Sequence, residues 1–199
     1  MCDIEYFGNI TGSKEHFGGM DTETVKVPIM IPDKFYIYNP DGDDHKKPVN
    51  AIKKLVDILY RNEDETLSIT VYIKTTKFAE EESRFTYRDR DLFPTLNDLL
   101  QDENNFSSKK LEKSVVEDIF GIIEHWDTFL CTDFSSIFKG LKDFDKNINE
   151  KLLNKNDLKP YIPWSTDRVK DMTETFMGAE KFNKSISKWR TNGVIYTIN

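Results

Sequence analysis

The sequence predicts an α+β protein: a small, mainly antiparallel sheet with one packed helix, then a helical second half with a C-terminal strand that returns to the sheet. Three observations support this prediction. Between residues 24 and 90, apolar and polar side chains alternate in several short runs, as in half-buried strands. After Asp91, apolar residues recur about every 3.6 positions, the period of a helix. With 199 residues, 38% of them hydrophobic, the chain is long enough for one substantial core.

The first half divides into a flexible, turn-rich N-terminus over residues 1–23 and a β-rich lobe over residues 24–92. Valines and isoleucines alternate over residues 25–31, and Pro28 favours an edge strand there. A second strand is expected at residues 35–38, because an Asn-Pro-Asp-Gly turn follows.

A helix and a hairpin complete this lobe. Pro48 suits the first turn of a helix, and the residues after it place apolar side chains on one face. Residues 67–74 alternate most regularly, and residues 84–88 alternate again after an acidic loop. These two runs predict a hairpin with a long tip.

The second half, residues 93–199, is expected to be helical and to form one compact unit with residues 24–92. Pro94 begins a short helix, and Ser107 or Ser108 caps a long one that runs to about Leu130. Four shorter helices follow, and an Asn-Gly turn leads into a strand at residues 194–198. No internal repeat is evident.

The amino-acid composition indicates the kind of genome that encodes the chain and limits the classes of partner that it can bind. Three alanines against 22 lysines indicate an AT-rich genome, as in some phages and mobile elements. The net charge of −7 disfavours a general nucleic-acid binder, because such proteins carry excess base to neutralise phosphates. The balance is uneven, since residues 159–199 hold 7 basic and 4 acidic side chains.

The chain reads as an intracellular, cytoplasmic protein. Cys2 and Cys131 are two isolated cysteines, so neither a disulfide framework nor a structural zinc site is expected. The acidic N-terminus lacks the charge pattern of a signal peptide. No stretch approaches the roughly 18 apolar residues of a membrane span, so we expect no membrane association.

The first candidate site is the tip of the predicted hairpin, which combines acidic and aromatic side chains: Phe78, Glu80, Glu81 and Glu82. The glutamates could steer a protein partner with a basic surface, and the phenylalanine could anchor it. The alternative is that Phe78 folds back onto the sheet and the glutamates are merely solvated.

The second candidate site is a basic face on the last predicted helix, formed by Lys181, Lys184 and Lys188 with Arg190 beyond them. Such a face could contact nucleic acid or an acidic partner. A solvated surface is the common alternative, so nucleic acid ranks second among the expected partners.

The third candidate is an enzyme site assembled from dispersed side chains: Asp41, Asp43, His45, Asp89 and Asp91. Their spacing fits neither a calcium loop nor a zinc site, so we expect no metal, no cofactor and no catalytic residue. His125 is expected at the surface, and Cys131 is expected to pack as a small hydrophobic residue.

The resulting hypothesis is a non-enzymatic protein-binding factor, of the inhibitor, adaptor or immunity type, that acts by occluding a partner protein. The alternatives are a nucleic-acid-associated factor that uses the basic C-terminal helix, and a small enzyme with a dispersed acidic site.

Overall fold

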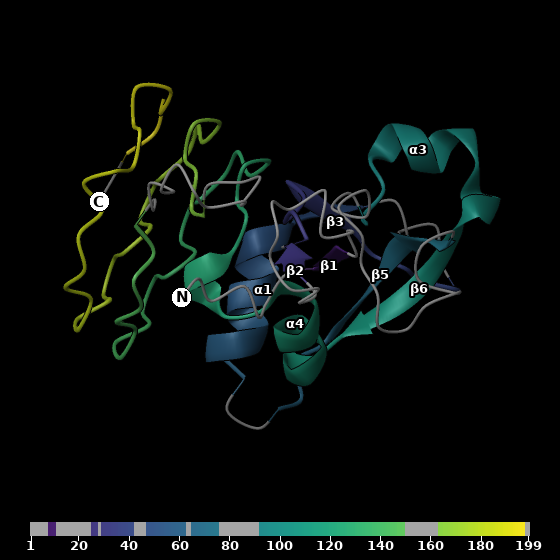
Figure 1. The fold of residues 1–199 in the computed structure, drawn as a ribbon, viewed down its shortest axis with the longest axis horizontal. Coiled ribbons are helices and arrows are strands. Elements are labelled where there is room, and N and C mark those ends of the chain that lie inside the picture. Colours follow the sequence, from purple (N-terminus) through teal and green to yellow (C-terminus); the bar gives the residue numbers. More distant parts are fainter. Residues whose placement is uncertain are drawn as a thin grey trace, which may run out of the picture.

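The computed structural model describes residues 8–10, 25–27, 29–41, 47–62, 65–75, 92–149 and 163–197. Strands and helices form one part of the molecule, and coils whose described residues contain no helix form a stack in the other (Figure 1). The C-terminus lies on the outermost coil, at the end of the molecule opposite α3 (Figure 1).

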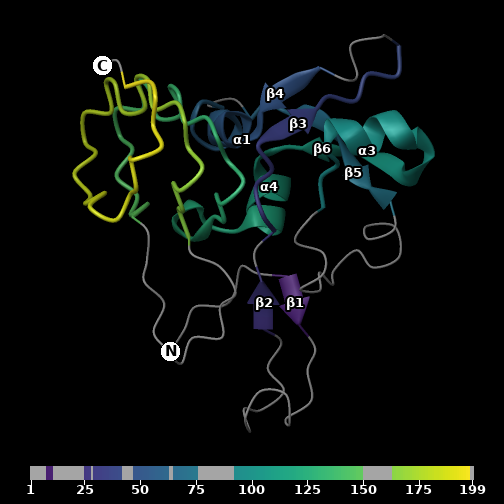
Figure 2. The same ribbon diagram turned by 90° about the horizontal axis from the view of Figure 1, so that it is seen from above.

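The described strands form three antiparallel pairs. They are β1 (Gly8–Ile10) with β2 (Val25–Val27), β3 (Lys34–Tyr36) with β4 (Pro48–Asn50), and β5 (Ile69–Lys74) with β6 (Phe106–Leu111). A bridge between Ile37 and Val71 joins the β3–β4 pair to the β5–β6 pair. The β1–β2 pair lies apart from the other two (Figure 2). The expected antiparallel sheet is therefore present, and the α+β class is confirmed.

The helix α1 (Ala51–Tyr60) packs its apolar face against this sheet. Its first turn is capped by the Asn50 side chain, which accepts a hydrogen bond of 3.1 Å from the Lys53 amide. Pro48 therefore lies in β4 rather than in the first turn of the helix. The buried side chains of α1 include Ile52, Leu55 and Val56.

The prediction of one long helix from Ser107 or Ser108 to Leu130 is wrong. Residues up to Leu111 form β6, which pairs along its whole length with β5. The helix α4 (Lys113–Phe120) follows, and it ends where Gly121 adopts a φ of 67°. A 3-10 turn, η4 (Ile123–His125), comes next. The short helix near Pro94 is present as α3 (Leu96–Gln101), followed by the 3-10 turn η3 (Glu103–Asn105).

The expected helices after residue 126 are also wrong, because the described residues there contain none. Residues 126–149 form coil 1, residues 164–188 form coil 2, and residues 189–197 begin coil 3. Two parallel bridges join the coils, Asp133 with Asp171 and Asp171 with Tyr196. The expected C-terminal strand therefore pairs with coil 2 and not with the sheet.

The amide groups of coil 1 explain why no helix forms. From Ser136 to Leu141, N–H groups donate in turn to the neighbouring coil and to the carbonyl three residues earlier. The Ile137 amide donates to Phe134 at 3.3 Å, for example, whereas the Phe138 amide donates to Thr175 of coil 2 at 3.0 Å. A helix would use every amide within its own segment.

Coils 1 and 2 are copies of one unit, which corrects the expectation of no repeat. Counterparts lie 38 residues apart, as Ser136 and Glu174 do. Both of these residues have positive φ angles, 55° and 54°, and the equivalent glycines Gly140 and Gly178 have 72° and 73°. The backbone therefore follows the same path in coil 1 and in coil 2.

One continuous core joins the sheet, the helices and the coils. Its centre within the coils is a column of three tryptophans, Trp126, Trp164 and Trp189, whose rings stack in sequence. A second column consists of Phe138 and Phe176, and a third of Phe144 and Phe182. Stacked aromatic rings thus replace the helix packing that the apolar spacing predicts.

Candidate functional site

The inner end of the coil stack is covered by the N-terminal half of the molecule. The Ile31 amide donates to the Asp127 carbonyl at 2.9 Å, which continues the coil ladder onto residues 29–31. The Asp33 carboxylate accepts hydrogen bonds from the Thr132 amide at 2.7 Å and from its hydroxyl at 2.6 Å. Coil 1 therefore lies between residues 29–33 on one side and coil 2 on the other.

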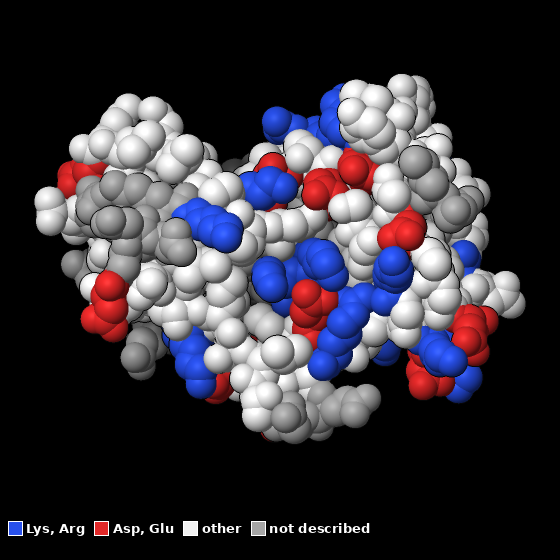
Figure 3. Space-filling model, turned by 180° about the vertical axis from the view of Figure 1, so that it is seen from behind, with Lys and Arg blue, Asp and Glu red and all other residues white. Residues whose placement is uncertain are grey.

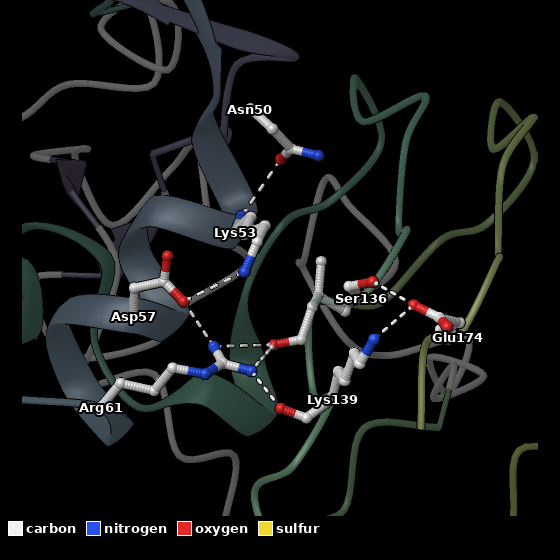
Figure 4. A network of polar contacts seen from close by, with 8 residues as sticks. Asn50, Lys53, Asp57, Arg61, Ser136, Lys139 and Glu174 are labelled. Carbon is white, nitrogen blue, oxygen red and sulfur yellow. Dashed lines mark hydrogen bonds and ion pairs between the residues drawn. The ribbon is translucent and has the colours of Figure 1, made fainter. Parts of the chain in front are cut away.

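A polar network ties α1 to the coils (Figure 4). The Arg61 guanidinium pairs with Asp57 and also donates to the Ile137 and Lys139 carbonyls, at 3.3 and 2.7 Å. Lys139 in turn pairs with Glu174 of coil 2 at 2.7 Å. The network fixes the coils relative to the helix.

Among the described residues, the outer end of the stack is less covered than the inner end. Phe138, Phe144 and Ile148 of coil 1 are buried, but their counterparts in coil 2 are not fully covered. The counterpart of Ile148 is Ile186, which is 39% exposed. The described part of coil 3 covers Trp164 through Trp189, and Asp171 through Tyr196.

A groove of about 490 Å³ lies at this end, and we call it the end groove. It is lined by Met172, Thr175, Phe176, Met177, Ile186, Trp189, Thr191 and Thr197. Met177 of coil 2 lies at its rim and is 49% exposed. In coil 3, the side chains of Ile195 and Tyr196 are 68% and 56% exposed. Exposed apolar side chains thus gather at this end of the stack.

The backbone hydrogen bonds between the coils differ between coil 1 and coil 2. In coil 1, the Phe138 and Gly140 amides donate to coil 2. Among the described residues, no backbone carbonyl accepts from the equivalent amides of coil 2, those of Phe176 and Gly178.

The expected basic helix face is wrong, because residues 181–190 form coil and not helix. Lys181 pairs with Asp143, Lys184 with Asp145 at 2.7 Å, and Arg190 with Asp167 at 3.1 Å. The backbone amide of Lys188 donates to the side-chain oxygen of Asn149 at 3.0 Å. The space-filling view shows basic and acidic side chains interspersed on one face of the molecule (Figure 3).

These pairs shift the titration of the groups involved. The hydrogen bond and charge of Lys181 lower the pKa of Asp143, and Asp143 raises the pKa of Lys181. Lys184 lowers the pKa of Asp145, and Lys139 lowers that of Glu174. The paired charges on coils 1 and 2 thus stabilise one another.

The other sequence-predicted sites fall largely beyond what the structure describes. Phe78, Glu80, Glu81 and Glu82 all lie outside the described residues, as do Asp43, His45, Asp89 and Asp91. Asp41 is described and exposed, in a turn after β3. Among the described residues, no three His, Cys, Asp or Glu side chains gather as metal ligands.

His125 and Cys131 are both buried. The expectation of a surface His125 is therefore wrong, because η4 turns its side chain into the core. Cys131 is 2% exposed, and burial raises the pKa of its thiol, so it packs as a hydrophobic residue as expected.

A second pocket, of about 460 Å³, lies between the end of α1 and the region from α4 to η4. Two acidic and two basic side chains line it with Tyr60: Glu117, Glu124, Lys113 and Lys146. Burial, with smaller contributions from Glu124 and Glu117, raises the pKa of Tyr60, so its hydroxyl stays protonated. Lys146 and Glu124 lie 3.7 Å apart and balance one another.

Sequence reasoning missed the end groove because it missed the repeat. The signal is present: Trp126-Asp127-Thr128 and Trp164-Ser165-Thr166 are each followed, after the same interval, by Gly140 and Gly178. Both threonine hydroxyls donate to the next coil, Thr128 to Ser165 at 2.8 Å and Thr166 to Arg190 at 3.2 Å.

One comparison with known proteins gives a match. Residues 103–198 match a family model described as Mycoplasma protein of unknown function, DUF285. The match covers a little under half of the chain and includes β6, α4 and the three coils. No curated protein and no solved structure matches the chain. Within the described residues, no helix is long and apolar enough to cross a membrane.

Proposed function

We propose that this chain is a non-enzymatic protein-binding factor that occludes a partner protein through its end groove. The observation that carries the proposal is the apolar surface at the outer end of the coil stack. There the aromatic rings of Phe176 and Trp189 line a groove whose rim residue Met177 is half exposed. Aromatic side chains in a partly desolvated pocket are the usual anchors of protein interfaces.

The charges around the groove favour a protein over a nucleic acid. Nucleic-acid affinity depends on basic side chains that neutralise phosphates. Lys181, Lys184 and Arg190 are already paired with carboxylates of the same chain. Binding phosphates there would require breaking these pairs, whereas an apolar partner surface would leave them intact.

The finer parts of this proposal are an inhibitor, adaptor or immunity-type role and an origin in a phage or other mobile element of an AT-rich genome. The acidic segment with Phe78 and Glu80, Glu81 and Glu82 remains a second proposed contact, suited to a basic partner surface. It would act by steering the partner, while the end groove would supply the apolar anchor.

Site-specific crosslinking in cells of the source organism tests the proposal. A photoreactive phenylalanine analogue replaces Tyr196 beside the groove in one variant and Leu100 in the control. Leu100 is a matched control because it is 63% exposed and lies on α3, at the opposite end of the molecule (Figure 1). We expect one protein species, identified by mass spectrometry, to crosslink through position 196 and not through position 100.

A second variant shows whether the crosslink depends on the groove. Met177→Asp places a charge on the groove rim and should reduce the yield by about tenfold or more, since a buried charge without a partner opposes binding. Equal crosslinking at positions 196 and 100, or a yield that Met177→Asp leaves unchanged, would contradict the proposed function.

A further inference from the structure

We propose that the second pocket binds a small zwitterion with an apolar body, about as large as a dipeptide. The pocket lies between the end of α1, the region from α4 to η4, and coil 1, and we call it the α1–α4 pocket. Small-molecule sites commonly lie where separate parts of a fold meet, and a volume of about 460 Å³ is within their usual range. The inference goes beyond the proposed function, because it concerns another site and another class of ligand.

Two ionised side chains of α4 offer the charges that a zwitterion needs. Lys113 and Glu117 both line the pocket and lie one helical turn apart. Within the described ranges, neither of them forms an ion pair. The other two charged side chains of the lining, Glu124 and Lys146, already pair at 3.7 Å. The pocket therefore keeps one charge of each sign for a ligand.

Tyr60 adds a neutral hydrogen-bond donor to the same pocket. Its ring packs edge-on against Phe144 of coil 1, with the ring centroids 5.4 Å apart, which orients the phenol. Burial raises the pKa of its hydroxyl, and the charges of Glu124 and Glu117 add to this effect, so both carboxylates lie near the hydroxyl. Because the hydroxyl stays protonated, it can donate to a ligand carboxylate while Glu117 accepts from a ligand ammonium group.

The remaining side chains of the lining are apolar, and one of them is poorly covered. Ile122 is 40% exposed, although its neighbours in the sequence, Gly121 and Ile123, are both buried. Leu59 of α1, which also lines the pocket, is half-buried. An apolar ligand body would remove this surface from water, which favours binding. An inorganic ion would leave it exposed.

The balance of charges disfavours a ligand that carries one sign of charge only. Two acidic and two basic side chains line the pocket. A phosphate would approach the carboxylates of Glu117 and Glu124, and a simple amine would approach the ammonium groups of Lys113 and Lys146. Like charges in a partly enclosed site repel one another, so a ligand with both charges fits this lining best.

Leucyl-leucine is the probe, titrated into the full 199-residue chain by isothermal titration calorimetry. We expect saturable binding. Three related compounds each lack one feature: N-acetyl-leucyl-leucine lacks the ammonium group, leucyl-leucine amide lacks the carboxylate, and glycyl-glycine lacks the apolar body. Each should bind about tenfold more weakly or less. Absence of saturable binding by leucyl-leucine, or equal binding by glycyl-glycine, would overturn the proposal.

Two variants of α4 test the predicted charge contacts. Glu117→Gln should weaken leucyl-leucine binding by about fivefold or more but leave the binding of the N-acetyl compound unchanged, because that compound has no ammonium group to lose. Lys113→Gln should act in the same way on leucyl-leucine and spare the amide. Asp118→Asn is the matched control, since Asp118 is exposed on the same helix and does not line the pocket. Equal effects of Glu117→Gln and Asp118→Asn would overturn the assigned contact.

NMR spectra locate the bound ligand. The backbone amide signals of Gly121 and Ile123 should shift when leucyl-leucine is added, because both residues line the pocket. The signal of Gly178, next to Met177 of the end groove, should not move. Shifts at Gly178 without shifts at Gly121 would place the ligand in the end groove and overturn the inference.

A further variant keeps the test decisive if a charge variant fails to fold. Circular dichroism checks the fold of each variant. If Glu117→Gln or Lys113→Gln loses the spectrum of the parent protein, Ile122→Ser replaces it, because this exposed side chain is expected to contact the apolar body of the ligand. Ile122→Ser should weaken leucyl-leucine by about threefold or more. Unchanged binding by a folded Ile122→Ser variant would contradict the proposed site.

Discussion

The indole ring of Trp126 lies 6.3 Å from that of Trp164, with 15° between the ring planes. Trp164 stands in nearly the same relation to Trp189, at 6.1 Å and 12°. The indole N–H of Trp164 donates to the Ile123 carbonyl at 2.6 Å, and that of Trp189 to the Ile148 carbonyl at 2.8 Å. The column therefore contributes both apolar burial and satisfied polar groups to the coils.

Trp164 should be the most sensitive position of this column, because rings cover both of its faces. We expect Trp164→Ala to lower the free energy of unfolding by about 3–5 kcal/mol. Urea denaturation measures this change. Ile122→Ala is the control, since Ile122 is 40% exposed and its loss should cost less than about 1 kcal/mol. Similar losses for the two variants would contradict the central role of the tryptophan column.

Gly178 should resist replacement for a reason of backbone geometry. Its φ of 73° is strained for any residue with a side chain, so Gly178→Ala should cost about 1–2 kcal/mol in unfolding free energy. Ala179→Gly is a control at the next position in the chain, where no positive φ demands glycine. A Gly178→Ala variant as stable as the parent protein would show that coil 2 can relax this turn.

Local patterns predicted two elements of the first half of the fold, β5 and α1. Alternation over residues 67–74 marks β5, and the apolar face after Pro48 marks α1. These elements are formed by nearby residues, so the period of the side chains reports the backbone directly. The errors there include β1, which forms within the segment expected to be turn-rich, and β5, whose described partner is β6. Asn50 caps α1, two residues beyond the proline.

The coils were mistaken for helices because their turns imitate helical spacing. Phe134, Ile137 and Phe138 follow one another at intervals that suit one face of a helix. In the structure, the same intervals arise because the Ile137 amide bonds back to Phe134, while the Phe138 amide bonds to coil 2. The bond to coil 2 joins residues far apart in the sequence, which no local period can reveal.

The repeat was obscured by unequal spacing. Trp126 and Trp164 are 38 residues apart, but Trp164 and Trp189 are 25 apart, because residues 150–162 intervene between coils 1 and 2. A search for one fixed period therefore fails, and with it the prediction of the end groove. The hairpin tip at Glu80–Glu82 stays a prediction.

The carboxylates that pair between the coils should make stability depend on pH in acid. The folded-state pKa values of Asp143, Asp145 and Glu174 lie below their ordinary values of 3.8, 3.8 and 4.5. Their stabilisation is thus fully present above those values and is lost as the pH falls through the lower, folded-state values.

A triple variant, Asp143→Asn with Asp145→Asn and Glu174→Gln, isolates this effect. At pH 7 its Tm should be below that of the parent protein, and the difference should shrink as the pH falls below the ordinary carboxylate range. Because these groups are exposed, added salt should also reduce the difference. A difference in Tm that is constant across pH would show that the substitutions act through packing rather than charge.

Arg61 should hold α1 to coil 1 through the shape of its guanidinium as much as through its charge. It donates to two carbonyls, those of Ile137 and Lys139, while it pairs with Asp57. Arg61→Met removes these donors and should lower the unfolding free energy by about 2 kcal/mol in urea denaturation.

Arg61→Lys separates shape from charge. A lysine ammonium can still pair with Asp57, but it lacks the planar fork that reaches both carbonyls, so Arg61→Lys should recover only part of the loss. Asp57→Asn, which removes the charge partner and leaves the carbonyl contacts in place, should cost less than Arg61→Met. If Arg61→Lys is as stable as the parent protein, the ion pair alone accounts for the contribution of Arg61, and the contacts to coil 1 add nothing.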